Sequence, residues 1–355
     1  MTSVVSQKRG KRMISTKELE QVKNTIVFDS FIKAMSVLKK HKKIMVSISG
    51  GSDSDLVLDI IEKCKTEDND VHYVWFDTGL EYQATKDHLV YLEEKYGITI
   101  EREKAKKPIP TCCKEFGQPF LSKYVSEMLA RLKRAGFKWE DKSYEELLRE
   151  YPNEKTGVRW WCSWYTEQRH FSYPSQFDVR RNKWLKEFLI KNPPTFDISS
   201  KCCTYAKKKV SKEYTKNFKA DLIVIGVRQA EGGIRATAYK NCYSYNSKQH
   251  ADQYRPIFWY TDEDKAYYEE HFDIRHSDCY TKYGLRRTGC VGCPYNRNID
   301  EEMKAIQAYE PKLAKACENI FNDAYEYTRA YKTFYAVMQE KEKHQMEGQK
   351  TLYDV

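Results

Sequence analysis

Long apolar runs are absent from this chain of 355 residues. A membrane-spanning helix needs about 20 consecutive apolar residues, whereas the most apolar stretches here, such as 222–227, have the length of a strand. The first residues, MTSVVSQKRGKRM, contain no apolar segment of the kind found in secretion signals. We therefore expect a cytoplasmic protein with no membrane partner, and we exclude an integral membrane protein and a secreted miniprotein.

Acidic residues are fewer than basic ones. The chain has 51 Asp and Glu against 61 Lys and Arg, which leaves a net charge of +10. Basic runs at 8–12, 102–107 and 207–219 stand beside Tyr and Trp residues, as in proteins that neutralise nucleic-acid phosphates. Solvated helix faces together with a site for an anionic mononucleotide explain the same charge, so the charge is consistent with either a nucleic acid or a mononucleotide as ligand.

The eleven cysteines are an odd number, and no secretion signal accompanies them. Both facts argue against a disulfide framework. The pairs Cys112-Cys113 and Cys202-Cys203 and the segment Cys290-Val291-Gly292-Cys293 point instead to metal binding or sulfur chemistry. Buried, unmetallated thiols are the alternative, and we prefer it for the isolated Cys64 and Cys317. For Cys112-Cys113 three interpretations stay open: alternative ligands, a redox or sulfur-accepting pair, or two buried thiols.

Short apolar strands alternate with amphipathic helices from residue 25 onward, with strands expected at 44–49, 71–76, 98–102, 222–225 and 255–258. This alternation predicts an α/β protein: a Rossmann-like, doubly wound parallel sheet with a helical insertion and a helical C-terminal extension. The expected parts are a basic arm (1–24), the first half of the α/β domain (25–103), a helical insertion or lid (104–200), the second half with the cysteine site (201–299) and the extension (300–355).

A glycine pair follows the first expected strand. Ser49-Gly50-Gly51-Ser52-Asp53-Ser54 stands where that strand ends and a helix begins. Glycines let the backbone turn tightly and approach a ligand, and the amide groups at the start of a helix face anions. The hexapeptide is neither a Walker loop nor GxGxxG. It therefore indicates a phosphate-binding loop, with an ordinary glycine-rich turn as the alternative.

Three further segments follow this loop, at 75–81 (WFDTGLE), 226–235 (GVRQAEGGIR) and 255–264 (RPIFWYTDED). Together with the SGGxDS loop they resemble, in order, motifs of the phosphoadenosine phosphosulfate (PAPS) reductase family within the adenine nucleotide α-hydrolase superfamily. The resemblance extends from about residue 42 to 294. It implies a HUP-type fold and an adenine nucleotide as ligand, either ATP or adenylyl sulfate or PAPS.

Ligands of doubly wound sheets lie at the carboxyl ends of the strands, where these motifs fall. Arginines there donate bidentate hydrogen bonds to phosphate or sulfate, and Asp77 can accept from the nucleotide or hold Mg²⁺ through water. Alternatively, Asp77 caps a turn and Arg235 forms a surface salt bridge. The expected cofactor-binding residues are Ser49, Gly50, Gly51, Ser52, Asp53, Ser54, Asp77, Thr78, Gly79, Gly226, Arg228 and Arg235, and the expected catalytic residues are Asp53, Asp77 and Arg228.

The context CCTYAKKKV at 202–210 resembles the cysteine segment of the cluster-bearing sulfonucleotide reductases. The resemblance implies a 4Fe–4S cluster with Cys202, Cys203, Cys290 and Cys293 as its metal ligands. Nearby lysines favour thiolates and offset the negative charge of such a cluster. A four-cysteine zinc site and unmetallated thiols are the alternatives.

The C-terminal E-C-G-(I/L)-H motif of those reductases, whose cysteine attacks the substrate, is missing; only Cys317 follows Cys293. We therefore expect an enzyme of the ATP pyrophosphatase type that activates an oxygen for sulfur transfer to a nucleic acid or a small acceptor, with a cysteine desulfurase or a thiol reductant as partner. A second hypothesis is reduction of adenylyl sulfate or PAPS by Cys317, Cys113 or a partner thiol. A third is a non-catalytic protein that binds nucleotides or nucleic acid.

Overall fold

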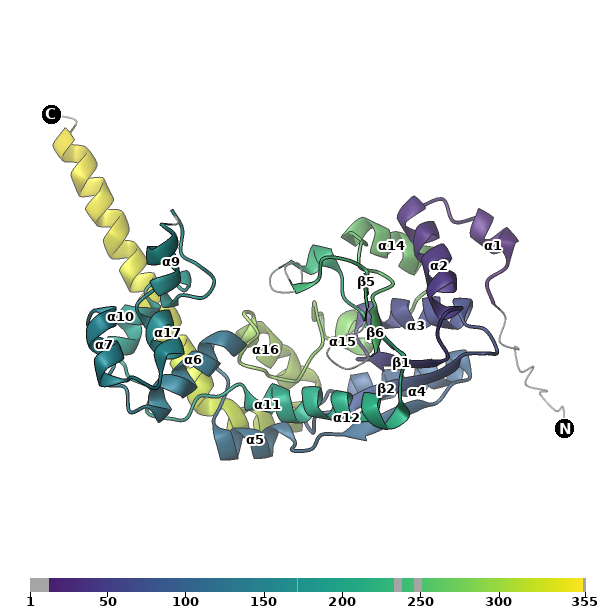
Figure 1. The fold of residues 1–355 in the computed structure, drawn as a ribbon, viewed down its shortest axis with the longest axis horizontal. Coiled ribbons are helices and arrows are strands. Elements are labelled where there is room, and N and C mark those ends of the chain that lie inside the picture. Colours follow the sequence, from purple (N-terminus) through teal and green to yellow (C-terminus); the bar gives the residue numbers. More distant parts are fainter. Residues whose placement is uncertain (1–12, 171, 233–237, 246–250, 354–355) are drawn as a thin grey trace. The chain divides into compact units, whose positions relative to one another are not determined.

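The computed structural model describes residues 13–170, 172–232, 238–245 and 251–353 (Figure 1). These residues belong to two compact units. The α/β unit comprises 1–108 and 205–291, and the helical unit comprises 109–204 and 292–355, apart from the gaps just given. Arg235 lies outside the described residues. Within the described part of the chain, no helix combines the length and apolarity that crossing a bilayer requires.

A six-stranded sheet forms the α/β unit, in the order β3-β2-β1-β4-β6-β5. All neighbours are parallel except β5, which is antiparallel to β6. This arrangement confirms the α/β fold with a mostly parallel, doubly wound sheet. The strands are β1 (Lys43–Ile48), β2 (Asp70–Asp77), β3 (Ile100–Lys104), β4 (Leu222–Val224), β5 (Tyr243–Ser244) and β6 (Asp252–Tyr254).

The prediction of a strand at 255–258 is wrong. The last parallel strand, β6, ends at Tyr254, and the residues after it form a turn. Pro256 has no amide hydrogen and cannot donate to a neighbouring strand, whereas the apolar residues around it fill the core: Ile257 and Phe258 are both fully buried. Burial without strand pairing accounts for the apolar pattern.

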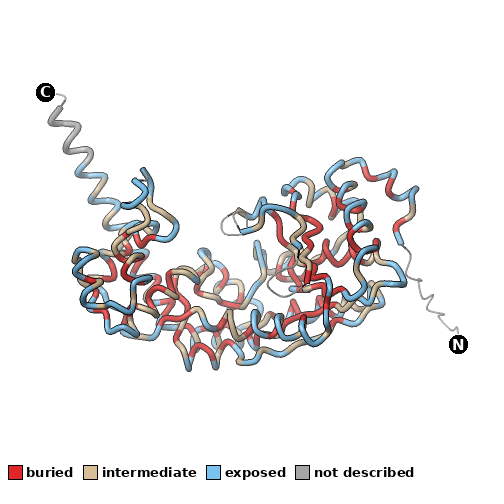
Figure 2. The backbone as a smooth tube through the Cα atoms, in the orientation of Figure 1, coloured by how far each residue is buried: buried red, intermediate tan, exposed pale blue. Residues whose placement is uncertain are grey.

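Alternate residues of β1 face opposite sides of the sheet. Ile44, Met45, Val46 and Ile48 are all buried, as are many residues of the α/β unit (Figure 2). Ile44, Val46 and Ile48 belong to one cluster with residues of helices α2, α3 and α14. Met45 belongs to a second cluster, which includes Val210 of α12. A strand covered on both faces reads as a continuous apolar run, which explains why the segment IMVSI is apolar at nearly every position.

Some helices of the α/β unit, namely α1, α2, α14 and α15, begin with a side-chain cap. Thr261 forms a capping box with Asp264, as its position before three acidic residues predicts. The α/β unit contains α1 (Thr16–Glu20), α2 (Thr25–Leu38), α3 (Ser52–Cys64), α4 (Gln83–Tyr96), α12 (Lys209–Phe218), α14 (Asp262–His271), α15 (Asp278–Thr281) and a 3-10 turn at Gln229–Glu231. A π-helical turn, Thr204–Lys208, precedes α12.

The helical unit has its own aromatic core. Trp160 and Trp161 are buried in it, and Trp161 donates its indole hydrogen to the carbonyl of Glu140. The aromatic stretch at 160–164 therefore serves packing at these two positions. The helices are α5 (Ile109–Phe116), α6 (Lys123–Arg134), α7 (Tyr144–Glu150), α8 (Lys155–Trp161), α9 (Trp164–Arg169), α10 (Leu185–Lys191), α11 (Lys201–Cys203), α16 (Ile299–Tyr309) and α17 (Pro311–Tyr353), with a 3-10 turn at Val179–Arg181.

Gly117 links two segments of the helical unit. Its φ is +101°, and a Cβ atom there would lie 2.2 Å from the carbonyl oxygen of Asp197. Replacing Gly117 with Ala is expected to lower the free energy of unfolding by about 2 kcal/mol, because the new methyl group strains the backbone and overlaps Asp197. Denaturant unfolding followed by tryptophan fluorescence measures the change. Gly136→Ala is the matched control, since its φ is also positive but its Cβ would meet open space; equal losses in the two variants would contradict the role of the overlap.

Candidate functional site

The glycine-rich loop joins β1 to α3, as its sequence predicts. Gly50 has a φ of +67°, and a Cβ on it would lie 2.6 Å from the side chain of Thr85. Inside the loop, the hydroxyl of Ser54 donates to the carbonyl of Gly51 (2.7 Å), and the amide of Gly51 donates to the hydroxyl of Ser49 (3.2 Å). These bonds fix the turn that leads from β1 into α3, at the carboxyl end of the strand, where helix N-termini bind anions.

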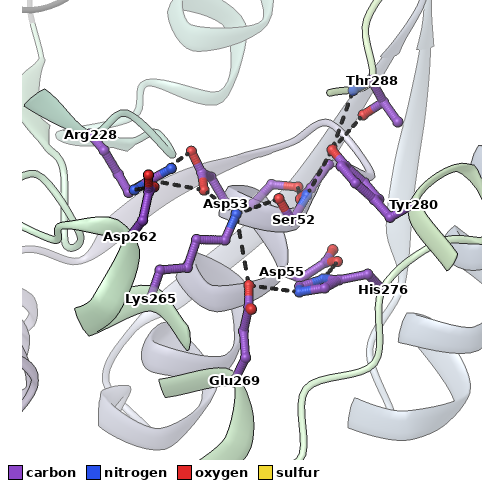
Figure 3. A network of polar contacts seen from close by, with 12 residues as sticks. Ser52, Asp53, Asp55, Arg228, Asp262, Lys265, Glu269, His276, Tyr280 and Thr288 are labelled. Carbon is purple, nitrogen blue, oxygen red and sulfur yellow. Dashed lines mark hydrogen bonds and ion pairs between the residues drawn. The ribbon is translucent and has the colours of Figure 1, made fainter. Parts of the chain in front are cut away.

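Asp53, in the first turn of α3, lies between two cations (Figure 3). Its carboxylate accepts from Arg228 Nε at 3.2 Å and from Lys265 Nζ at 2.8 Å. Burial alone would raise the pKa of Asp53, but the ion pairs with Lys265 and Arg228 outweigh it and leave the pKa below its ordinary value. Asp53 is therefore ionised at neutral pH and holds both cations beside the loop.

Lys265 reaches the loop from α14 and is a residue that the sequence analysis missed. Its Nζ atom is 2.5 Å from the hydroxyl of Ser52, 2.8 Å from Asp53 and 3.7 Å from Glu269 (Figure 3). The available signal was its place directly after the 255–264 segment, next to Asp264. The three acidic residues at the start of this helix indicate helix capping, and nothing in the local pattern indicates that the next residue, Lys265, contacts the loop.

Arg228 connects the segment 226–228 to the same place. It donates to Asp53 and, at 2.8 Å, to Asp262. Gly226 is needed there because a Cβ on it would lie 3.2 Å from the backbone of Asp53. The structure thus brings together Asp53, Gly226 and Arg228, three of the residues predicted from two separate motifs.

A second network lies behind the loop and centres on Asp55, which is 1% exposed. His88 of α4 (3.0 Å) and His276 (2.8 Å) both contact its Oδ2 atom, and His276 also contacts Glu269 at 2.8 Å (Figure 3). Burial alone would lower the pKa of His276, but the hydrogen bonds to Asp55 and Glu269 raise it to about 9. His276 is therefore a cation at neutral pH, and Glu269 links it to Lys265.

Tyr280 fixes the loop from a third direction. Its hydroxyl accepts from the amide of Ser52 (3.1 Å) and lies 3.2 Å from the hydroxyl of Thr288 (Figure 3). A Cβ on Gly51 would lie 3.0 Å from Thr288 and 3.2 Å from the Tyr280 hydroxyl. The two hydroxyls thus occupy the space beside the first amides of α3, where an anion would bind, and Tyr280 and Thr288 were not predicted.

Asp77 ends β2, the strand beside β1, and caps the following turn by accepting from the amide of Gly79 at 2.8 Å. Thr78 is buried and donates to Glu81 at 2.5 Å. Burial raises the pKa of Glu81. The structure therefore shows the capping interaction for Asp77, at the same sheet edge as the loop, and the DTGLE segment forms a turn held by its own side chains.

The side chains in these networks do not carry a positive excess. Arg228, Lys265 and protonated His276 supply three positive charges, whereas Asp53, Asp55, Asp262 and Glu269 supply four negative ones. A polyphosphate bound at the loop would contact helix amides and two cations, but it would also lie near carboxylates whose negative charge exceeds the positive charge of these side chains. A divalent cation held by a carboxylate and by the phosphates themselves resolves this imbalance.

Three of the four predicted metal ligands, Cys202, Cys203 and Cys293, lie in the helical unit together with Cys113 of α5. Hydrogen bonding to Cys113 and burial raise the pKa of Cys202, and hydrogen bonding to Cys203 opposes this. Cys293 is also near enough to raise the pKa of Cys202. Cys290 belongs to the α/β unit. The interaction of Cys113 with Cys202 was not expected, because none of the family motifs includes Cys113.

No three Cys, His, Asp or Glu side chains among the described residues are placed as ligands of one metal ion. The four thiolates of a 4Fe–4S cluster each bind a different iron and are spread around the cube, so this finding bears on a single-ion site. An all-thiol donor set suits iron–sulfur clusters and zinc, and it does not suit Mg²⁺. By donor chemistry, the cysteines fit the implied cluster.

Two isolated cysteines are buried packing residues. Burial, followed by the charge of Asp59, raises the pKa of Cys64 to about 12. Burial, followed by the charge of Glu302, raises the pKa of Cys317 to about 12. Only a thiolate is a competent nucleophile, so Cys317 is unsuited to replace the missing catalytic cysteine of the reductases.

Residues 43–156 match the family model of the phosphoadenosine phosphosulfate reductase domain. This match confirms the resemblance over these residues. It includes the Ser49–Ser54 loop and the turn at 77–81, and it ends before Arg228, Lys265 and Cys202. An uncharacterized protein of Methanocaldococcus jannaschii is 31% identical to this chain over 165 residues, which are 46% of this chain and 30% of the relative. The aligned part is thus less than a third of that relative's length.

Three solved structures are similar to this chain at low sequence identity. The reductase of Candida auris, in a phosphate complex, covers 79% of this chain and 98% of its own (12% identity, TM-score 0.39). The U34-tRNA thiolase NcsA of Methanococcus maripaludis, with its 4Fe–4S cluster, covers 94% of this chain and 89% of its own (13% identity, TM-score 0.39). The NH3-dependent NAD synthetase of Campylobacter jejuni, with a nitrate ion, covers 85% of this chain and 94% of its own (12% identity, TM-score 0.34).

Proposed function

We propose that this chain binds ATP with Mg²⁺ at the Ser49–Ser54 loop and transfers its adenylyl group to an oxygen of an acceptor, which sulfur then replaces. The observation that carries the proposal is the convergence of Asp53, Arg228 and Lys265 on the N-terminus of α3. The helix amides and Lys265 would bind the β- and γ-phosphates. Asp53 would hold the Mg²⁺ that the local charge balance calls for.

In the proposed step, the acceptor oxygen forms a bond to the α-phosphorus, and the bond between that phosphorus and the bridging oxygen of the β-phosphate breaks. Pyrophosphate leaves with the electron pair of the broken bond. Arg228 would donate hydrogen bonds to the oxygens on which charge develops, and Asp77, at the end of β2, would orient the nucleotide. The terminal sulfur of a persulfide, the product of a cysteine desulfurase, would then bond to the activated carbon of the acceptor while AMP leaves with the acceptor oxygen. A thiol reductant would supply two electrons to cleave the remaining S–S bond and release the thiolated acceptor.

A 4Fe–4S cluster on the cysteines would supply sulfur binding or electron transfer at the acceptor. The side chains of the protein would hold it: Cys202 and Cys203 on α11, and the Cys290-x-x-Cys293 segment. The acceptor is a nucleic acid or a small molecule. Two of the basic residues proposed to bind nucleic acid are already paired, since Arg102 pairs with Glu93 (2.7 Å) and Lys106 with Glu213 (2.6 Å).

The proposal predicts that the anaerobically purified protein binds ATP only with Mg²⁺ present and releases pyrophosphate when its acceptor is added. Isothermal titration with ATP, adenylyl sulfate and PAPS measures the preference, and a coupled assay with total tRNA, DNA and small hydroxyl compounds measures pyrophosphate. Sulfite release from adenylyl sulfate with a thiol would support the reductase hypothesis instead. Tight ATP binding without turnover on any acceptor would support a non-catalytic nucleotide-binding protein, and absence of nucleotide binding would refute the proposal.

A further inference from the structure

Helix α12 packs on the sheet of the α/β unit through one face (Figure 1). Val210 is buried in the cluster that contains Met45, and Tyr214 and Phe218, which follow Val210 at four-residue spacing, pack against the same cluster. Residues four apart lie on one face of an α-helix. Positions two residues away from them lie on the opposite side of the helix, because two residues turn it by about 200°.

The opposite side of α12 carries a row of exposed lysines. We define the lysine stripe as these four residues: Lys208, Lys209, Lys212 and Lys216. Lys208 directly precedes α12 and has helical backbone angles, so it continues the same face. The acidic residue of α12, Glu213, pairs with Lys106 at 2.6 Å. Within the described residues, no carboxylate forms an ion pair with the stripe, which leaves four uncompensated positive charges on one face.

The lysine stripe begins at the carboxyl edge of the sheet. The ring centre of Tyr205 lies 3.8 Å from Lys209 Nζ and 5.6 Å from Nζ of Lys107, which follows the carboxyl end of β3. At the other end of α12, Lys43, the first residue of β1, donates to the carbonyl of the last helical residue (3.4 Å). The stripe therefore starts at the edge that bears the Ser49–Ser54 loop and extends from it for about 12 Å, the rise of eight helical residues.

We propose that the lysine stripe binds the phosphate backbone of a nucleic acid. A row of ammonium groups, about 6 Å apart along the helix axis where they follow at four-residue spacing, attracts a regular polyanion. Lysines bind phosphates as point charges and do not read base edges, so the binding is independent of sequence. A lipid surface fits less well, because helices that bind bilayers insert an apolar face and that of α12 packs on the sheet.

The stripe also identifies the class of acceptor in the proposed reaction, and this part of the inference rests on the proposed function. A nucleic acid held along α12 reaches the carboxyl edge of the sheet, where the nucleotide loop lies. A small acceptor would gain nothing from four cations that extend away from that edge. The acceptor is therefore a nucleic acid, and its nucleotide at the carboxyl edge is the one that reacts.

The test is fluorescence anisotropy of labelled duplex DNA and of labelled total tRNA with the full chain, at several salt concentrations. The stripe variant combines Lys208→Gln, Lys212→Gln and Lys216→Gln, which keep a good helix former at each position. Its affinity at about 100 mM salt is expected to fall at least about 10-fold, and the slope of log K against log salt by about 2 to 3, because each neutralised phosphate contributes about 0.9. The control variant replaces three exposed lysines on other helices of the same unit by Gln: Lys17, Lys33 and Lys86.

A second measurement uses the wild-type protein alone. Acetylation of lysines followed by mass spectrometry is expected to be slowed by tRNA or DNA at the stripe and unchanged at the three control lysines.

Equal loss of affinity in the stripe and control variants would show that only the net charge matters and would overturn the proposal. Unprotected stripe lysines, or no binding of DNA or tRNA at low salt, would overturn it as well. Binding of phosphatidylserine vesicles that is lost in the stripe variant, without binding of nucleic acid, would assign the stripe to a membrane. Isothermal titration with Mg²⁺–ATP tests the nucleotide site separately: the stripe variant is expected to bind as wild type does, and absence of ATP binding beside stripe-dependent binding of nucleic acid would refute the proposed function alone.

Discussion

Replacing Lys265 with Met is expected to weaken the binding of Mg²⁺–ATP by about 10- to 100-fold, the range for loss of one charge-assisted hydrogen bond to a ligand. Lys265 places its ammonium 2.5 Å from Ser52 and 2.8 Å from Asp53, at the start of α3. Methionine keeps most of the side-chain volume but removes the charge. The two carboxylates that Lys265 contacts, Asp53 and Glu269, then repel the phosphates. Isothermal titration at constant Mg²⁺ measures the affinity.

Lys282→Met is the matched control for this experiment. Lys282 pairs with Asp278 on the surface and is 65% exposed, so its removal lowers the net charge of the protein by the same amount without touching the loop. The control is expected to change the affinity by less than about twofold, as for an exposed pair. If the two variants bind Mg²⁺–ATP equally, Lys265 does not contact the phosphates and the assignment of the loop loses its main support.

The stability of the protein is expected to fall as the pH rises from about 7 to 10, because His276 loses its proton. In the folded state, burial lowers the pKa of His276, but the hydrogen bonds to Asp55 and Glu269 raise it to about 9; in the unfolded chain a histidine titrates near about 6.5. When folding raises the pKa of a group, that group stabilises the folded state fully at pH values below its pKa in the unfolded chain. This stabilisation is lost as the pH rises through the pKa of the group in the folded state. The difference between the two pKa values of His276 corresponds to about 3 kcal/mol in the free energy of unfolding.

Urea unfolding at several pH values between 6 and 10 measures this effect, with His276→Gln as the variant. Glutamine donates one hydrogen bond but carries no charge, so the variant is expected to be less stable at pH 6 and to approach wild type near pH 10. His271→Gln removes an exposed histidine of α14 and is expected to follow the wild-type curve. Parallel curves for wild type and His276→Gln would show that another group controls the pH dependence.

The contacts around Asp53 change how the net charge of +10 is interpreted. That excess suggested a positively charged phosphate pocket, but the networks around the loop contain three positive and four negative side chains. The cations are held between carboxylates that keep them aimed at the helix start. Affinity for a polyphosphate then depends on helix amides and a divalent cation, which is why Mg²⁺ dependence is a central expectation of the proposed function.

The sequence by itself determined the features that depend on neighbours along the chain. Alternating apolar strands and amphipathic helices predicted the α/β sheet, and Gly50 and Gly51 predicted the strand-to-helix loop, because backbone freedom and periodicity are local properties. Local patterns also misled at 255–258, where buried apolar residues follow Pro256 without forming a strand.

Only the tertiary structure decided which distant residues meet. The contact of Lys265 with Ser52 joins residues 213 positions apart, and the network of His276, Asp55 and His88 draws on separate helices and a connecting segment. Helix α5 meets α11 near Cys113 and Cys202 because the backbone of Gln118 pairs with Asp197 and Ser199. Such contacts depend on how helices and strands pack against one another, so the residues of a single segment do not predict them.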